Sequence, residues 1–265
     1  TFEYELMRLR WLFSAVFIGL VNVPCYAQTE IAQVFKTHQV QGTIVLRSLK
    51  QDVAIIYNPD RAQLPFASAS TFKILHSLIA LEEKVITKTD VIKWDGTTYD
   101  INTWNQDQTL ASAFQVSCVW CYQTFAKQIS AKKYQHYIDS THFGHLSPNF
   151  AQTTFWLDGS LTISALEQVA FLKKLYQHQF AFSADHYQTL AEIMLAEKTN
   201  DYRLYAKTGW AARSTPQIGW YVGYVETQQD TWFFALNINI NDTKDLALRQ
   251  LITKQVLTNQ HIISP

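Results

Sequence analysis

The sequence predicts an α+β fold in which an antiparallel β-sheet is flanked by terminal helices and an all-helical region is inserted between its strands. Strand-like segments lie toward both ends of the chain, helical periodicity fills the middle, and no low-complexity linker or internal repeat divides them. The chain has 265 residues, of which 48% are hydrophobic, so it can bury a sizeable core. We therefore expect a sheet assembled from segments far apart in the sequence.

The expected strands form two groups. A hairpin is predicted from residues 42–47 and 53–57, which are rich in β-branched side chains, and Asn58-Pro59-Asp60 closes its second strand. The later strands are predicted at residues 202–207, 218–226 and 231–239.

Helical spacing of apolar residues begins after the hairpin. Ile74, Leu75 and Leu78 start an apolar stripe that continues with Ile79 and Leu81. Further helices are predicted at residues 109–130, 132–140, 164–178, 184–196 and 246–257.

The charges of the chain balance, with 22 basic and 22 acidic residues. No run of like charges creates a field that would attract nucleic acid or an anionic membrane surface. These properties give no indication of a polyanion partner.

The N-terminus predicts a secretory signal peptide over residues 1–27, with residues 1–6 as an upstream extension before Met7. Arg8 and Arg10 precede an apolar run over residues 11–23, and a small-x-small site allows cleavage after Ala27. The run is shorter than the roughly 20 residues that span a bilayer. We therefore expect a mature domain over residues 28–265 in the periplasm, without stable membrane association. An uncleaved anchor and acylation of Cys25 are the alternatives.

Two further cysteines, Cys118 and Cys121, have the Cys-x-x-Cys spacing of thioredoxin-like redox sites. Such a site opens a helix directly after a strand, whereas residues 110–116 are helical in pattern. We interpret the pair as two buried apolar side chains, with a local disulfide as the alternative.

Ser70 and Lys73 stand one helical turn apart at the start of the apolar helix. Residues at i and i+3 have Cβ atoms roughly 5–6 Å apart, so the two side chains can meet. A serine becomes a nucleophile when a nearby base removes its proton, and a lysine serves as that base only when its surroundings favour the neutral amine. A capped helix with one surface charge is the alternative until further motifs are considered.

Two such motifs follow in order. Ser117 and Val119 form a Ser-x-Val element, and Lys207-Thr208-Gly209 follows a predicted strand. Each is weak alone, but together with Ser70 and Lys73 they are specific.

With these motifs the chain resembles the class D, or oxacillinase-type, serine β-lactamases from about Gly42 to its end. The resemblance implies the fold of serine β-lactamases and penicillin-binding transpeptidases, with the active site between the sheet and the helical region. The matching segments are ASTFK at 69–73, IKWDG at 92–96, TWNQD at 103–107, FWLDG at 155–159, ISALEQV at 163–169, AKTGW at 206–210, IGWYVGYVE at 218–226 and LRQLITKQVL at 248–257.

The resemblance implies hydrolysis of β-lactam antibiotics, and hence antibiotic resistance, through an acyl-enzyme on Ser70. The backbone N–H groups of Ser70 and Trp210 would form the oxyanion hole. Lys73 would be carbamylated, as N6-carboxylysine, and would act as base in acylation and deacylation. No cofactor is expected except carbon dioxide or bicarbonate for this modification. Val119, Trp156 and Leu157 match the positions that shelter and orient it.

Other matched positions concern the leaving group and the substrate. Ser117 would relay a proton to the leaving nitrogen, assisted by the positive charge of Lys207. Thr208 and Arg249 would bind the substrate carboxylate next to Gly209, because the guanidinium fork pairs with a carboxylate through two hydrogen bonds. Trp104 matches a position at the mouth of the site.

A loop-bridging pair, Arg213 with Asp158, resembles one found in carbapenem-hydrolysing members and predicts carbapenem turnover. Phe143-Gly144-His145 departs from the Tyr-Gly-Asn usual in the family, so support from that motif is in doubt. His142 and His145 have metal-ligand spacing, but no acidic or cysteine ligand lies near them in sequence, so no metal site is expected.

Two alternatives to a β-lactamase remain at this point. A penicillin-binding receptor shares the motifs but stays acylated, and a peptidoglycan transpeptidase or carboxypeptidase attacks a peptide. Sustained turnover separates a hydrolase from both. The sequence is compatible with a homodimer without indicating one.

Overall fold

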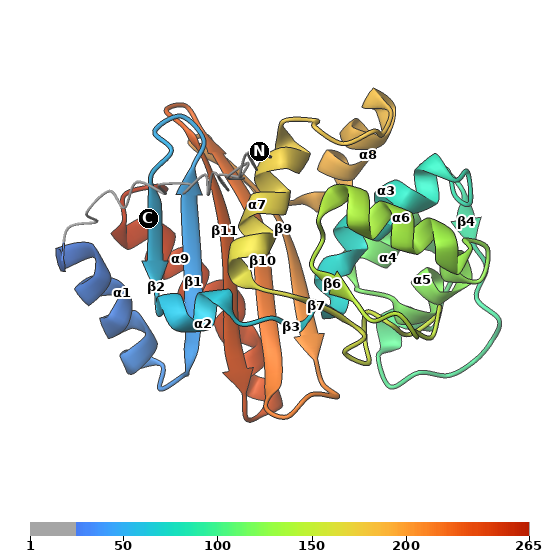
Figure 1. The fold of residues 1–265 in the computed structure, drawn as a ribbon, viewed down its shortest axis with the longest axis horizontal. Helices are drawn as coiled ribbons and strands as arrows, with labels where there is room; N and C mark the ends of the chain where they lie inside the picture. Colours follow the sequence, from blue (N-terminus) through green and yellow to red (C-terminus); the bar gives the residue numbers. More distant parts are fainter. Residues whose placement is uncertain (1–24, 265) are drawn as a thin grey trace, which may run out of the picture.

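The computed structural model describes residues 25–264 and contains a six-stranded antiparallel sheet with strand order β2-β1-β11-β10-β9-β8 (Figure 1). The sheet joins segments from both ends of the described chain, so the predicted α+β fold is confirmed. Its strands are β1 (Gly42–Ser48), β2 (Ala54–Tyr57), β8 (Leu195–Lys198), β9 (Tyr202–Ala211), β10 (Gln217–Thr227) and β11 (Thr231–Ile240).

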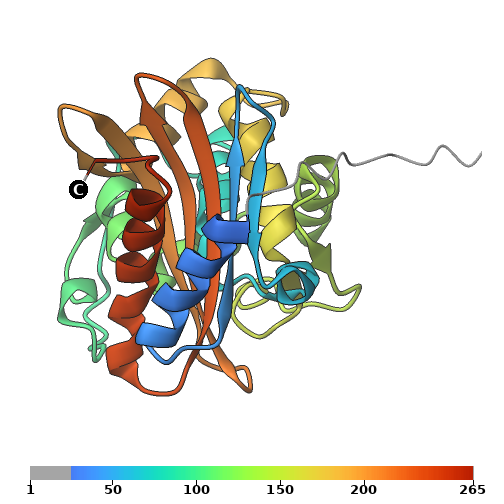
Figure 2. The same cartoon turned by 90° about the vertical axis from the view of Figure 1, so that its left-hand side faces the viewer.

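One face of the sheet is covered by α1 (Cys25–Thr37) and α9 (Leu248–Asn259), which lie side by side across the strands (Figure 2). Ile31 and Phe35 of α1, four residues apart, are buried against this face, as are Ile252 and Val256 of α9. This spacing is that of an amphipathic helix with one apolar stripe. Helix α9 agrees with the prediction, whereas α1 was not predicted.

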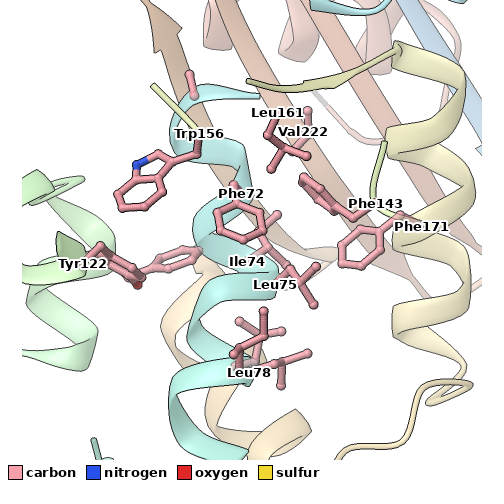
Figure 3. Close-up of a cluster of buried hydrophobic side chains, with 14 of the residues drawn as sticks. Phe72, Ile74, Leu75, Leu78, Tyr122, Phe143, Trp156, Leu161, Phe171 and Val222 are labelled. Atoms are coloured by element: carbon pink, nitrogen blue, oxygen red, sulfur yellow. The ribbon is translucent and has the colours of Figure 1, made fainter. Parts of the chain in front are cut away.

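The opposite face carries α7 (Ala165–Tyr176) and, beyond it, the helical region (Figure 1). Ser164 caps α7 in a capping box with Glu167, which satisfies the free N–H groups of its first turn. The core between sheet and helices forms around Phe72, which lies with Leu75 of α3 (Lys73–Glu82) among aromatic rings from several elements (Figure 3).

The remaining elements are short or belong to the helical region. They are α2 (Pro59–Gln63), β3 (Phe66–Ala67), η1 (Ala69–Phe72), β4 (Val91–Ile92), η2 (Asn102–Trp104), β5 (Gln108–Thr109), α4 (Leu110–Gln115), α5 (Val119–Ala126), α6 (Ala131–Thr141), β6 (His145–Leu146), β7 (Leu161–Ile163), α8 (Ala184–Met194) and η3 (Thr243–Ala247).

The helix predicted over residues 109–130 is two helices, α4 and α5. The apolar pattern runs through both, but Ser117 between them has φ of 55°, a left-handed conformation that ends a right-handed helix. The prediction for residues 184–196 is corrected as well, because the chain leaves α8 after Met194 and forms the edge strand β8.

The expected leader lies largely outside the described residues, which begin at Cys25, and the expected cleavage site after Ala27 falls in the first turn of α1. Within residues 25–264, no helix has the length and apolar character needed to cross a bilayer.

Candidate active site

The turn that carries Ser70 is fixed by hydrogen bonds from three directions. Thr71 Oγ1 donates to the Ser68 carbonyl at 2.6 Å and accepts from Gln168 Nε2 at 2.7 Å, while Trp220 Nε1 donates to the Ala67 carbonyl at 3.0 Å. The hydrogen bond from Gln168 on α7 and the hydrogen bond from Trp220 on β10 connect the turn to both sides of the site. Ser70 is therefore held within the short helix η1, directly before α3, where it lines a cleft.

Lys73 begins α3, and its Nζ atom lies 3.2 Å from Ser70 Oγ. The lysine is fully buried, and its Nζ atom lies 4.8 Å from the centre of the Tyr122 ring. Among the described residues, no carboxylate forms an ion pair with Lys73. Burial disfavours the ammonium form and lowers the pKa of Lys73 to about 7. A large share of the amine is consequently neutral at neutral pH, as a base must be.

Trp156 is buried beside the first turn of α3. Its ring centroid is 6.2 Å from that of Phe72, directly before Lys73, and 5.2 Å from that of His76, one turn after it. The indole Nε1 is buried and finds no acceptor in the described part of the chain. A buried N–H without a partner is costly, so this donor marks a position where an acceptor fits.

Ser117 and Lys207 meet across the cleft. Lys207 Nζ donates a hydrogen bond to Ser117 Oγ and a second one, of 3.1 Å, to the Thr208 carbonyl. Burial, and then the charges of Lys73 and Arg249, hold the pKa of Lys207 well below its ordinary value. Ser117 thus accepts a hydrogen bond from a buried amine whose charged form is disfavoured by burial and by Lys73 and Arg249.

Arg249 lies at the N-terminal end of α9. Its Nη1 donates to the Gly209 carbonyl at 2.7 Å and its Nε to the Leu246 carbonyl at 2.6 Å. A guanidinium has five N–H donors, so three remain for a ligand. Burial lowers the pKa of Arg249 to about 10, which still leaves it cationic at neutral pH.

The cleft at these residues has a volume of about 520 Å³. Lys73, Trp156 and Lys207 lie buried behind its lining. The predicted residues that line it are Ser70, Trp104, Ser117, Val119, Leu157, Thr208, Gly209, Trp210, Arg213 and Arg249.

Sequence reasoning missed several lining residues. Gln115 and Val116 precede the Ser-x-Val element and could have been inferred by adjacency, whereas Ile101 and Leu246 belong to no motif. A larger hollow of about 680 Å³ lies near Glu30 and His261 and contains none of the motif residues.

Two sequence interpretations need correction or qualification here. Cys118 and Cys121 are buried, as expected, but they form a disulfide, so the alternative interpretation is the correct one. No ion pair joins Arg213 to Asp158 in the described residues, and the Asp158 carboxylate instead accepts from Thr154 Oγ1 at 2.6 Å and from the Ser160 N–H at 3.0 Å.

The Phe143-Gly144-His145 segment lies away from the cleft lining. Phe143 is fully buried against the ring of Phe171, and His145 Nε2 is 3.0 Å from Glu167 Oε1. Phe143 therefore contributes to the core, whereas the imidazole of His145 lies at the surface beside Glu167. Residues 25–264 hold no group of three or more His, Cys, Asp or Glu side chains arranged to bind a metal.

The fold and the serine–lysine site define a member of the penicillin-binding transpeptidase superfamily, and a family model for the penicillin-binding protein transpeptidase domain matches residues 35–258. Within it, the chain belongs to the class D (OXA-type) β-lactamases. It is 41% identical over 230 residues to β-lactamase OXA-48 of Klebsiella pneumoniae, covering 86% of this chain and 87% of that protein.

The structure superposes on the class D β-lactamase FUS-1 (OXA-85) of Fusobacterium nucleatum subsp. polymorphum with a TM-score of 0.86 and 33% identity, covering 89% of this chain and 99% of that one. The regulatory protein BlaR1 of Bacillus licheniformis is 40% identical over 207 residues, which cover 77% of this chain but 34% of that protein. The chain is a serine β-lactamase and hydrolyses β-lactams.

Proposed function

We propose that this β-lactamase acts through an acyl-enzyme on Ser70, with Lys73 as the base that forms it and, once carbamylated, as the base that hydrolyses it. The observation that carries the proposal is the 3.2 Å separation between Lys73 Nζ and Ser70 Oγ, in surroundings that lower the pKa of the lysine to about 7. An ordinary lysine, with a pKa near 10.4, would be almost entirely protonated at pH 7 and could not take the serine proton.

In acylation, Ser70 Oγ gives its proton to the base and bonds to the lactam carbonyl carbon. The backbone N–H groups of Ser70 and Trp210 stabilise the oxyanion, and removal of one such donor typically costs on the order of 10²–10³ in rate. The carbonyl–nitrogen bond then breaks, and Ser117 passes a proton to the leaving nitrogen. The hydrogen bond that Lys207 donates to Ser117 supports this role, because a donor to the serine oxygen stabilises that oxygen as its proton leaves.

The residues around Lys73 fit a carbamate. Its amine is substantially neutral, Val119 and Leu157 line the cleft next to it, and Trp156 Nε1 offers an unused buried donor to a carbamate oxygen. The carbamate, made from carbon dioxide or bicarbonate, supplies a base that activates water for deacylation. The chain contributes a dry pocket that keeps the amine neutral and an indole that orients the group.

We propose that the substrate carboxylate binds where Thr208, Gly209 and Arg249 meet, with Trp104 against the body of the substrate. The three free donors of Arg249 and its retained charge support this assignment. A charge-assisted fork is the geometry that recognises a carboxylate.

Carbapenem turnover is the finer part of the proposal. It rests on Arg213 in the cleft lining and on the resemblance of Arg213 and Asp158 to a pair in carbapenem-hydrolysing members of the family. No ion pair joins the two residues within residues 25–264. Steady-state hydrolysis of a carbapenem by purified protein supports it. Hydrolysis of penicillins with only stoichiometric acylation by the carbapenem contradicts it.

The location proposed is the periplasm, after cleavage of residues 1–27. The basic residues Arg8 and Arg10, the apolar run and the small residues before Gln28 support it. Intact mass and N-terminal sequencing of protein recovered from a periplasmic extract test the cleavage. Recovery of an uncleaved or acylated chain from the membrane fraction contradicts it.

One experiment tests the mechanism as a whole. A chromogenic cephalosporin is mixed with enzyme with and without added bicarbonate, and the acyl-enzyme is followed by mass spectrometry. Sustained turnover that rises with bicarbonate and is lost in Lys73→Ala supports the mechanism, and the exposed Lys36→Ala is the control. A single burst with a persistent adduct would contradict the proposed deacylation by Lys73.

A further inference from the structure

The residue that follows Ser117 is covalently tied to the first turn of α5. Cys118 is the N-cap of that helix, and its Sγ atom is bonded to that of Cys121, the third residue of the helix. Both cysteines are fully buried, and their Cα atoms are 5.5 Å apart. An N-cap side chain normally accepts a hydrogen bond from the N–H of this third residue. Here the Cys121 N–H donates to Cys118 Sγ at 3.3 Å, and because sulfur is a weak acceptor, the covalent bond reinforces a weak cap.

Ser117 itself stands between two helices in a conformation that is unfavourable for serine. Its N–H donates to the Phe114 carbonyl at 3.2 Å and the N–H of Cys118 to the Ala113 carbonyl at 2.9 Å, which together form a Schellman motif at the end of α4. The residue at this position usually is glycine, because φ is positive there. Ser117 has φ of 55° and carries a side chain that must reach Lys207.

We propose that the Cys118–Cys121 disulfide is a positioning element for proton delivery by Ser117: it fixes the junction of α4 and α5 so that the serine hydroxyl stays on Lys207. The bond is adjacent in sequence to the serine and leaves the junction no freedom on its α5 side. The inference rests on the proposed role of Ser117. The cysteines touch neither the substrate nor the reacting atoms, and they affect the reaction only through the position of Ser117.

The consequence is specific to one half of the reaction. Ser117 delivers its proton when the lactam nitrogen leaves, so a loosened junction slows acylation. Deacylation depends on Lys73 and Trp156, which α3 and the surrounding aromatic core hold in place. A general loss of structure would slow both halves.

The test compares oxidised protein with protein refolded in the presence of a dithiol. The dithiol reduces the S–S bond to two thiols on the chain and is itself oxidised to a cyclic disulfide. Alkylation followed by mass spectrometry counts the thiols: after removal of residues 1–27 the only cysteines left are Cys118 and Cys121, so the reduced protein should show two thiols and the oxidised protein none. Circular dichroism and thermal unfolding establish that the reduced protein is folded. Pre-steady-state kinetics then give the acylation and deacylation rates separately.

We expect reduction to slow acylation by roughly tenfold or more. This loss is a part of the rate increase, on the order of 10²–10⁴-fold, that a positioned proton donor contributes. The deacylation rate should stay within about twofold of its value in the oxidised protein. The double variant Cys118→Ser/Cys121→Ala, in which a hydroxyl replaces sulfur as the N-cap acceptor, should recover acylation relative to Cys118→Ala/Cys121→Ala. In Ser117→Ala, reduction should have no further effect on acylation. Unchanged acylation in the folded, reduced protein overturns the inference, as does an equal loss in the Ser117→Ala background. Normal acylation by oxidised Ser117→Ala would instead overturn the proposed role of Ser117.

Discussion

The Nζ atom of Lys73 lies 3.2 Å from the Oγ atom of Ser70 in a position from which water is excluded, because the lysine side chain is fully buried. The pair comes from one helical turn, so its geometry depends little on the rest of the fold. Its chemistry, in contrast, depends on the walls around it, since burial is what lowers the pKa of Lys73 to about 7.

The first prediction concerns pH. Below pH 7 Lys73 is increasingly protonated, so it can neither accept the proton of Ser70 nor react with carbon dioxide. The acylation rate and the carbamate signal in ¹³C NMR with labelled bicarbonate should therefore both rise with pH through about 7 and level off above it. A carbamate signal that persists unchanged to pH 5 would contradict the assignment.

The second prediction concerns the unused donor of Trp156. Trp156→Phe retains an aromatic ring next to Phe72 and His76 but removes Nε1. Carbamylation should fall and deacylation should slow on the order of 10²-fold, leaving a burst of product followed by accumulation of the acyl-enzyme. The control is Trp232→Phe, on the opposite face of the sheet, which should change neither rate. Equal deacylation in the two variants would remove Trp156 from the mechanism.

The third prediction concerns the substrate carboxylate. Hydrogen bonds to charged groups contribute about 1.5–3 kcal/mol, so Arg249→Ala should raise KM for a penicillin roughly tenfold to a hundredfold. Arg249→Lys should recover part of this loss, because it keeps the charge without the fork. The preference for a cephalosporin acid over its methyl ester should decrease in the same variants.

Arg203→Ala, at an exposed arginine near Glu226, is the matched control for the loss of a charge. A preference for the acid that survives in Arg249→Ala would place the carboxylate elsewhere.

The fourth prediction concerns stability. Gly144 has φ of 66°, and a Cβ atom there would lie 2.0 Å from the Thr162 carbonyl oxygen. Gly144→Ala should lower the free energy of unfolding by about 2–4 kcal/mol. Gly159 has φ of 90°, but an added Cβ meets nothing within 4 Å, so Gly159→Ala should cost only about 1–2 kcal/mol of backbone strain. Urea unfolding of the two variants measures the difference, and equal losses would show that the contact with Thr162 relaxes.

Much of the site could be predicted because most of its residues belong to short sequence motifs. Ser70 and Lys73 are neighbours on one helix, and Lys207 and Thr208 are consecutive on a strand. In contrast, Ile101 and Leu246 enter the cleft only through tertiary packing, so no local pattern marks them. The break at Ser117 was missed because the apolar spacing of α4 continues into α5, and a single left-handed residue leaves that spacing almost unchanged.

The disulfide could not be decided from sequence for a related reason. In the long helix that was expected, Cys118 and Cys121 would be two apolar residues of its buried face. Once Cys118 is an N-cap, its side chain points back over the first turn and meets Cys121. The edge strand β8 was missed because it is only four residues long and its sequence, Leu-Ala-Glu-Lys, lacks the alternation of apolar and polar residues typical of a strand.

The edge of the sheet has a further consequence. Strand β8 pairs with β9 at Arg203, Leu204 and Tyr205, while residues 207–211 of β9 pair, within residues 25–264, with β10 alone. The backbone N–H and C=O groups on the outer edge of that stretch can form hydrogen bonds with a short extended amide. A β-lactam is a cyclic amide. Such an edge is also where foreign chains add strands and aggregate. Ile101 and Trp210, both exposed, line the same cleft as Thr208 and Gly209 of this stretch, so a foreign strand that paired here would have to enter the substrate cleft.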